Sequence, residues 1–173
     1  MTSNKTKDLV LTALMAALIF VATYLIRIPN PATGGYSHLG DCMIFLTVVL
    51  LGRRNGSIAA GLGGALSDFL AGAPAWILPT LVIKYIMAFI MGTVIKINPE
   101  SRKLQLAGAV LGGAFQIFAY TMVKVFLFGG AVAVASLPNV TIQTTFGIVI
   151  FFVLYQAFSG TLLKLFKKNK GTV

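Results

Sequence analysis

The sequence has 173 residues, of which 57% are hydrophobic and only 10% are charged. A soluble domain carries about 25% charged residues, so this composition predicts an all-α integral membrane protein, with residues 1–173 as one membrane domain. The net charge of +10 does not indicate nucleic-acid binding, because the basic residues form short clusters between apolar runs. The single cysteine, Cys42, excludes an internal disulfide and a cysteine-rich metal site.

Six apolar runs follow one another, and each is expected to form a transmembrane helix. A bilayer core of about 30 Å needs roughly 20 helical residues. The second and third runs are short for a complete span, so half-length or strongly bent helices are expected there. A polar, glycine-rich loop is expected at 30–38 and a weakly polar loop before the last helix. The expected helices cover residues 7–27, 39–52, 56–72, 76–97, 104–128 and 140–166.

The basic residues gather on alternate connections, which predicts the orientation of the chain. One side is expected to carry Lys5, Lys7, Arg53, Arg54, Lys96, Arg102, Lys103, Lys164, Lys167, Lys168 and Lys170. The positive-inside rule then places both termini in the cytoplasm and requires an even number of spans. The expected location is the cell (plasma) membrane, with multiple passes. There is no strong tandem repeat, so an inverted-repeat transporter is not indicated.

Four ionisable residues lie in or next to the predicted spans: Asp41, Asp68, Lys84 and Lys124. A charge at the centre of a membrane helix costs about 2.5–3.5 kcal/mol. The predicted topology puts all four in the outer half of the membrane. Two interpretations stay open, namely two structural ion pairs or a polar cavity that holds a small polar ligand.

Helical spacing favours the ligand interpretation. Gln116, Tyr120 and Lys124 are four residues apart, so they share one face of the fifth predicted helix. Aromatic residues gather near the outer end; they are typical either of an interfacial belt or of a site for a flat heteroaromatic ligand. His38 has no second histidine nearby, so no metal site is expected. The candidate substrate-binding residues are Tyr36, His38, Asp41, Asp68, Trp76, Lys84, Tyr85, Gln116, Tyr120 and Lys124.

The first predicted helix carries small residues on one face, Ala13, Ala16 and Ala17. In lipid such a face favours close contact with another helix, either within the protein or on a partner. The sequence has no catalytic motif and no phosphate-binding loop. We therefore expect neither enzymatic activity nor a cofactor, and uphill transport would need an ion gradient or a partner.

Several segments carry a resemblance to a known family. They are GYSHLGD at 35–41, LGRRNG at 51–56, and residues 61–68 and 76–84, in that order, with Ala13 and Ala17 on the first helix. Together they resemble the S component of energy-coupling factor (ECF) transporters, closest to the riboflavin-type or hydroxymethylpyrimidine/pyridoxine-type group. The specific part of the resemblance covers about residues 13–84. Lys124 and Gln143 lie beyond it and are assigned from topology alone.

The resemblance implies a six-helix protein that captures a vitamin near the outer face and docks on a membrane T component joined to two ATPases. It also implies that Ala13 and Ala17 contact the T component, that the loop at about 29–38 helps to cover the substrate, and that the S component topples in the membrane. The paired charges favour pyridoxine or hydroxymethylpyrimidine as substrate. The alternatives are a membrane scaffold or assembly subunit without ligand, an autonomous ion-coupled carrier, and an intramembrane enzyme.

Overall fold

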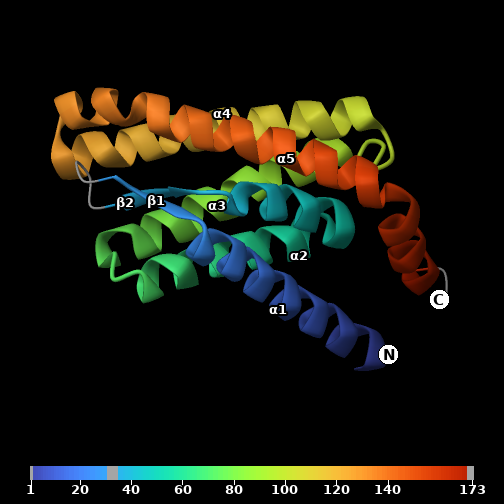
Figure 1. The fold of residues 1–173 in the computed structure, drawn as a ribbon. Coiled ribbons are helices and arrows are strands. Elements are labelled where there is room, and N and C mark those ends of the chain that lie inside the picture. Colours follow the sequence, from blue (N-terminus) through green and yellow to red (C-terminus); the bar gives the residue numbers. More distant parts are fainter. Residues whose placement is uncertain (1, 31–34, 171–173) are drawn as a thin grey trace.

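The computed structural model describes the backbone of residues 2–30 and 35–170 and the side chains of residues 5–27 and 38–157. The described part contains five helices and one pair of short strands (Figure 1). All five helices are long and apolar enough to cross a membrane. In chain order the elements are α1 (Thr2–Leu25), β1 (Arg27–Asn30), β2 (Gly35–His38), α2 (Gly40–Leu70), α3 (Pro74–Ile95), α4 (Arg102–Phe128) and α5 (Gly130–Lys170).

Helix α2 reverses direction at Gly52, which has a φ of 77° and a ψ of −178°. The reversal brings its two parts together: a Cβ atom on Gly56 would lie 2.8 Å from the Cα atom of Val48. We call residues 40–51 the first arm and residues 53–70 the second arm of α2. They occupy the places of the two short helices expected at 39–52 and 56–72. The described part of the chain therefore has five helical elements, one of which, α2, combines two of the expected helices, and the number of membrane spans stays a prediction.

Strands β1 and β2 form an antiparallel pair in which Arg27 is opposite His38 and Asn30 is opposite Gly35. A polar, glycine-rich loop is expected from the sequence at 30–38, and the strand pair corrects this expectation. The first arm of α2 rises only about 18 Å over its 12 residues, too little for a bilayer core. Strand β2 contacts α1 and α5 just before this arm begins, so the strand pair packs against the bundle next to the start of α2.

Helix α5 begins at Gly130, ten residues earlier than the expected start at residue 140. Gly129, with a φ of 85°, ends α4, and the chain re-enters helical geometry at once. Pro138 lies inside α5 without ending it. A proline removes one backbone donor, and a membrane helix tolerates this loss where neighbouring groups satisfy the freed carbonyl.

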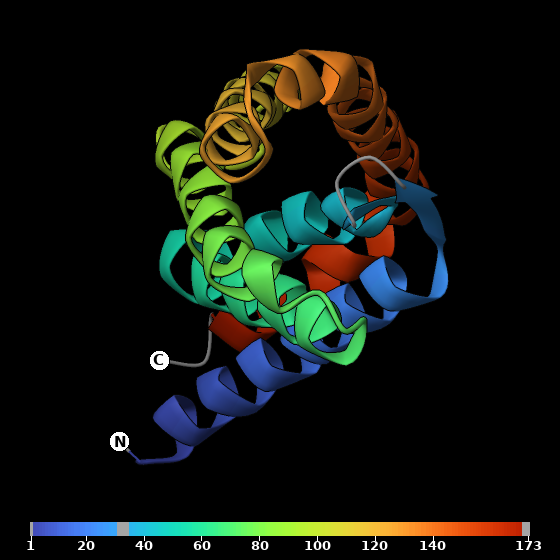
Figure 2. The same ribbon diagram turned by 90° about the vertical axis from the view of Figure 1, so that its left-hand side faces the viewer.

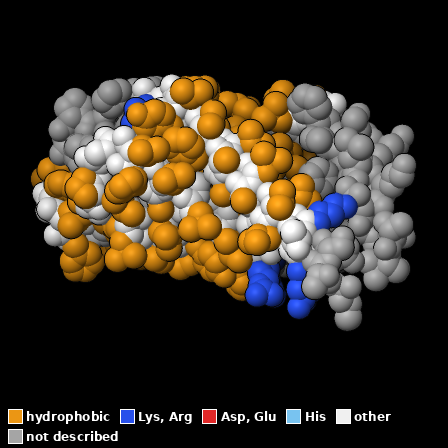
Figure 3. Space-filling model, turned by 90° about the horizontal axis from the view of Figure 1, so that it is seen from below, with side chains coloured by type: hydrophobic (Ala, Val, Ile, Leu, Met, Phe, Trp, Pro, Cys, Tyr) orange, Lys and Arg blue, Asp and Glu red, His pale blue; other side chains and the backbone are white. Residues whose placement is uncertain are grey.

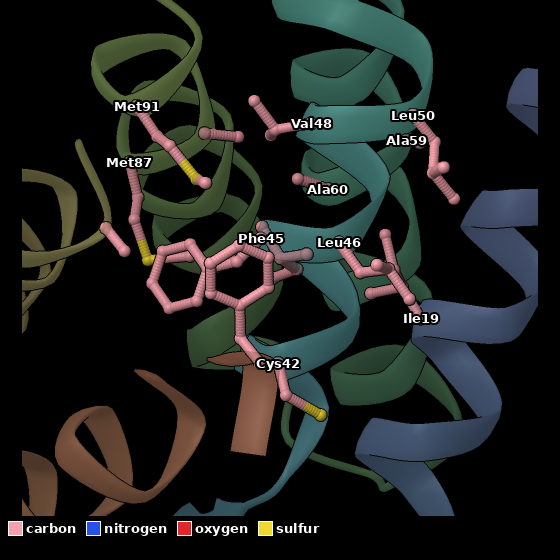
Figure 4. Close-up of a cluster of buried hydrophobic side chains, with 14 of the residues drawn as sticks. Ile19, Cys42, Phe45, Leu46, Val48, Leu50, Ala59, Ala60, Met87 and Met91 are labelled. Carbon is pink, nitrogen blue, oxygen red and sulfur yellow. The ribbon is translucent and has the colours of Figure 1, made fainter. Parts of the chain in front are cut away.

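The largest hydrophobic core lies between the two arms of α2, α3, α5 and α1. Figure 4 shows its centre, where Phe45 of the first arm faces Met87 and Met91 of α3, while Ile19 of α1 packs near Leu46. Seen from one end in Figure 2, α1 lies across α2, and the first arm forms a ring with α3, α4 and α5. This ring encloses the polar residues described below.

The two chain ends lie at the same end of the bundle, opposite the strand pair (Figure 1). Figure 3 shows a face covered mostly by hydrophobic side chains, with most of its Lys and Arg side chains at the end near the termini. The arrangement agrees with the alternation of charge in the sequence, although the side of the membrane stays a prediction. The side chains of Lys164, Lys167, Lys168 and Lys170 lie outside the described part.

Candidate functional site

The most polar point of the interior is a buried ion pair between Lys84 on α3 and Asp41 on α2. The Lys84 ammonium donates to Asp41 Oδ1 at 2.5 Å and to Gln116 Oε1 at 2.5 Å. Gln116 in turn donates from Nε2 to Asp41 Oδ2 at 2.7 Å. All three side chains are fully buried. The triangle joins three helices, and its charges cancel.

Helix α5 completes this arrangement. Gln143 Nε2 donates to Asp41 Oδ2 at 3.2 Å, and Gln116 Nε2 also donates to Thr144 Oγ1 at 2.8 Å. Thr144 Oγ1 in turn donates a hydrogen bond to the backbone carbonyl of Val140 at 2.8 Å. We call Asp41, Lys84, Gln116, Gln143 and Thr144 the polar network. Gln116 and Gln143 bond directly to the buried ion pair, and Thr144 bonds to Gln116. Such neutral partners lower the cost of burying the two charges.

His38 connects the polar network to the strand pair. Its backbone N–H donates to Gln143 Oε1 at 3.3 Å, and its Nδ1 accepts the N–H of Gly40 at 3.1 Å. Burial lowers the pKa of His38 from 6.5 to about 4, and the Lys84 ammonium acts in the same direction. The imidazole is therefore neutral at physiological pH and serves as an acceptor at the start of α2.

Local structure explains why these side chains meet. Asp41 lies in the first turn of α2, where the helix dipole favours a carboxylate. A Cβ atom on Gly147 would lie 2.6 Å from Asp41 Cβ, so glycine allows the α5 backbone to approach this carboxylate. Gly64 does the same for α3, since its Cβ would lie 3.2 Å from Lys84 Cγ. Small residues at these two contacts let three helices converge on one point.

Aromatic rings lie on the strand-pair side of the polar network. Trp76 contacts Tyr120 at 5.9 Å between ring centroids and stacks on Phe128 at 6.0 Å. The Tyr120 hydroxyl donates to Thr80 Oγ1 at 3.0 Å, and the Lys84 ammonium lies 5.5 Å from the centroid of the Tyr120 ring. We call Trp76, Tyr120 and Phe128 the aromatic cluster. Tyr120 thus contacts both Lys84 of the polar network and Trp76 of the aromatic cluster.

The polar network lies deeper than the sequence analysis expected. Lys84 is the eleventh of the 22 residues of α3, and Gln116 is the fifteenth of the 27 residues of α4. Both are therefore near the middle of their helices instead of the outer half. Trp76 and Lys124 lie nearer the helix ends, as expected.

Two of the expected charged residues do not join the polar network. Lys124 is buried on the same face of α4 as Gln116 and Tyr120, with 8% of its surface exposed, and no described residue forms a hydrogen bond or ion pair with it. Asp68 is buried near the end of the second arm, where its backbone carbonyl accepts the N–H of Ala73 at 3.0 Å. Asp41, Asp68, Lys84 and Lys124 thus do not form the two ion pairs considered from the sequence, because Lys124 has no ion-pair partner among the described residues.

Two expected tyrosines do not take part in the described site. Tyr85 is 37% exposed and stacks on Phe89 at 6.1 Å, so it lies on the outside of α3. Consecutive residues of a helix point in different directions, and Tyr85 directly follows Lys84. The side chain of Tyr36 lies outside the described residues; only its backbone in β2 is described.

The small residues of α1 divide between two environments. Ala13 and Ala17 are exposed, on the same surface as Leu14 and Leu18. Ala16 is partly buried and packs against the core that includes Ile19. The contact face proposed from the sequence is therefore narrower than expected, with Ala13 and Ala17 pointing away from the bundle.

Two threonines of the site, Thr80 and Thr144, are not among the residues predicted from the sequence. Thr80 bonds to Tyr120, and Thr144 bonds to Gln116. Their sequence signal is weak, because a threonine in a helix usually bonds to its own backbone. Thr144 directly follows Gln143, which is assigned from topology alone. A Gln-Thr pair inside an apolar run is the signal that could have indicated a buried polar contact at Thr144.

Comparison with known proteins identifies what this bundle is similar to. Residues 3–159 match the model of the family described as ECF-type riboflavin transporter, S component. A protein of Pyrococcus woesei, described as "Uncharacterized protein in gap 3'region", is 42% identical over 155 residues, which cover 90% of this chain and 98% of that protein. The UPF0397 protein YdcD of Lactococcus lactis is 35% identical over 92 residues, 51% of this chain and 50% of that protein.

Solved structures show the same fold. A structure described as the S component of a bacterial ECF transporter has a TM-score of 0.74 with 19% identity, covering 91% of this chain and 98% of the other. The S component for biotin from an ECF-type ABC transporter has a TM-score of 0.66 with 21% identity, covering 90% of this chain and 94% of the other. At these identities the likeness concerns the fold alone.

Proposed function

The chain belongs to the family of ECF-type riboflavin transporter S components, and we propose that it captures a small vitamin or vitamin precursor from outside the cell. It is an integral membrane protein, and its family is one of transporter subunits instead of enzymes. The proposed site lies between the polar network and the strand-pair end of the bundle. Delivery to the cytoplasm would use a membrane T component and two ATPases, because the sequence contains no phosphate-binding loop of its own.

One observation carries the proposal: Gln116, Tyr120 and Lys124 form a continuous buried stripe on α4. Along this stripe a hydrogen-bonding amide, an aromatic ring and a cation follow one another at one-turn intervals. Facing lipid, such a stripe would be costly, and here it faces the bundle interior. A few polar groups beside aromatic rings are typical of sites for small ring-containing ligands.

Pyridoxine or hydroxymethylpyrimidine is the favoured cargo. A single polar ring suits a site formed by Trp76 of α3 together with Tyr120 and Lys124 of the α4 stripe. Riboflavin is the alternative, because the matching family carries that name. The proposed residues are Trp76, Tyr120 and Lys124 for direct contact, with Asp41, Lys84 and Gln116 as the polar floor and His38 at its edge. Asp68 and Tyr36 stay candidates for residues that cover the substrate on the outer side of the site.

Equilibrium binding to the purified protein tests the proposal. Pyridoxine, hydroxymethylpyrimidine, riboflavin and biotin would be titrated separately, and compounds that co-purify would be identified by mass spectrometry. Binding of one ring compound, weakened at least about tenfold by Tyr120→Ala, is expected. The absence of any bound or co-purifying compound would favour a membrane scaffold. Uptake into liposomes that contain this chain alone would favour an ion-coupled carrier.

A further inference from the structure

Two lysines are buried in the described part of the chain, and they differ in one respect: Asp41 neutralises Lys84, whereas no described residue neutralises Lys124. Lys84 has Asp41 and Gln116 at 2.5 Å. Lys124 has 8% of its surface exposed, yet no described residue offers it a carboxylate or any other hydrogen-bond acceptor. A buried ammonium without a counter-ion is costly, so such a group normally has a partner.

The direction of Lys124 is fixed by its place on α4. It continues the stripe of Gln116 and Tyr120 and is buried, while its neighbours Val125 and Phe126 are exposed. Residues four apart on a helix share a face, so the lysine faces the bundle interior and not the lipid. Its position, one turn before the end of α4, keeps it on the same side of the polar network as the aromatic cluster.

The aromatic cluster lies beside Lys124. The Trp76 ring stacks on Phe128 and is tilted against Tyr120. On α4, Tyr120 lies one turn before Lys124 and Phe128 lies one turn after it. Aromatic faces accept flat rings by offset stacking. A flat cargo held there would bring a substituent within reach of the lysine.

We propose that Lys124 selects among the proposed ring compounds by charge, and that the cargo carries an anionic oxygen group (a carboxylate, a phosphate or, as in pyridoxine, a phenolate) on a flat ring, which favours pyridoxine over hydroxymethylpyrimidine and riboflavin. This inference rests on the proposed function and names its substrate class. The polar network cannot set this preference, because its single positive and single negative charge already compensate each other. The anionic group would give Lys124 the counter-ion that the described part of the chain does not provide.

Matched neutral and anionic probes test the inference on the purified full-length protein in lipid nanodiscs. The pairs are nicotinamide and nicotinate, and riboflavin and flavin mononucleotide. Kd values would be measured for the wild type, Lys124→Met and Lys124→Arg. Lys103→Met is the control, because Lys103 is an exposed lysine of the same helix.

In at least one pair the anionic member is expected to bind the wild type at least about tenfold more tightly. Lys124→Met should abolish that preference, whereas Lys124→Arg and Lys103→Met should keep it. Equal binding of both members of each bound pair, unchanged by Lys124→Met, would overturn the inference and leave the proposed function standing. If no probe binds and no compound co-purifies, the proposed function fails and this inference fails with it.

Discussion

The ammonium of Lys84 lies 2.5 Å from Asp41 Oδ1, and neither side chain is exposed. The two residues are 43 positions apart in the sequence and come from different helices. Their pairing therefore fixes the start of α2 against the middle of α3. Since both charges are buried, the loss of one leaves the other without compensation.

We expect Lys84→Met or Asp41→Asn to lower the free energy of unfolding by about 3–5 kcal/mol, the cost of leaving one buried charge unpaired. The double variant should be less destabilised than the sum of the two single effects, because no lone charge remains. Thermal unfolding in detergent measures this. Lys96→Met, at an exposed lysine, should have little effect. Additive losses in the double variant would contradict the coupling.

Gly147→Ala should destabilise the protein by about 1–3 kcal/mol, the usual cost of overpacking. The added methyl group would lie 2.6 Å from Asp41 Cβ, so α5 must move away from the carboxylate. Gly130→Ala on the same helix is the matched control, because a Cβ there meets nothing within 4 Å. Unfolding temperatures of the two variants give the comparison, and equal values would argue against the close contact.

The parts of the fold that follow from hydrophobicity were predicted from the sequence. The apolar runs gave the positions of α1, α3 and α4, and the polar stripe on α4 was correctly assigned to the bundle interior. The start of α5 was placed wrongly, because Gly129, Gly130 and Pro138 resemble helix-breaking signals. In α5, however, surrounding helices and lipid favour continued backbone hydrogen bonding over an open loop.

The sequence does not show which polar side chains of the site contact one another. Asp41, Lys84 and Gln116 were expected as buried polar residues, but nothing in their spacing says which of them touch. Their contact depends on close helix approach at Gly64 and Gly147, which is a property of the three-dimensional arrangement. Tyr85 was expected in the site as one of the aromatic residues near the outer end, but it directly follows Lys84, and adjacent helical residues face different ways.

Stability should fall as the pH drops from about 6.5 towards 4, in part through His38. Its pKa in the folded protein is about 4, below the ordinary value of 6.5, so in this range the unfolded chain binds a proton that the folded chain rejects. The full effect is about 3 kcal/mol. His38→Asn keeps an acceptor for the Gly40 N–H and cannot titrate. Melting curves at several pH values should show a smaller acid loss in this variant, and identical losses would exclude His38 as a cause.

Cysteine labelling tests the predicted orientation. The native Cys42 is buried, so a new cysteine at an exposed position acts as the only reporter. Ala75→Cys, near the start of α3, is expected to react with a membrane-impermeant maleimide on intact cells. Glu100→Cys, between α3 and α4, should react only after permeabilisation, and the unmodified protein should not react. The reverse pattern would place the termini outside the cell.

The exposed alanines of α1 are expected to contact a partner helix. Ala13 and Ala17 lie one turn apart and point away from the bundle, where a second helix has room to approach closely. Ala13→Trp or Ala17→Trp should therefore abolish co-purification with the T component. Vitamin binding should stay within about threefold of the wild-type affinity, because α1 contributes no residue to the polar network or the aromatic cluster.

Ala107→Trp provides the matched control, since Ala107 is an exposed alanine on another membrane helix, α4. It introduces the same ring into the same lipid environment, so it should leave both complex formation and binding intact. Equal loss of the complex in all three variants would mean that tryptophan disturbs membrane insertion in general. Loss of vitamin binding together with the complex would instead mean that the α1 face supports the bundle, and the partner surface would have to be sought on a different helix.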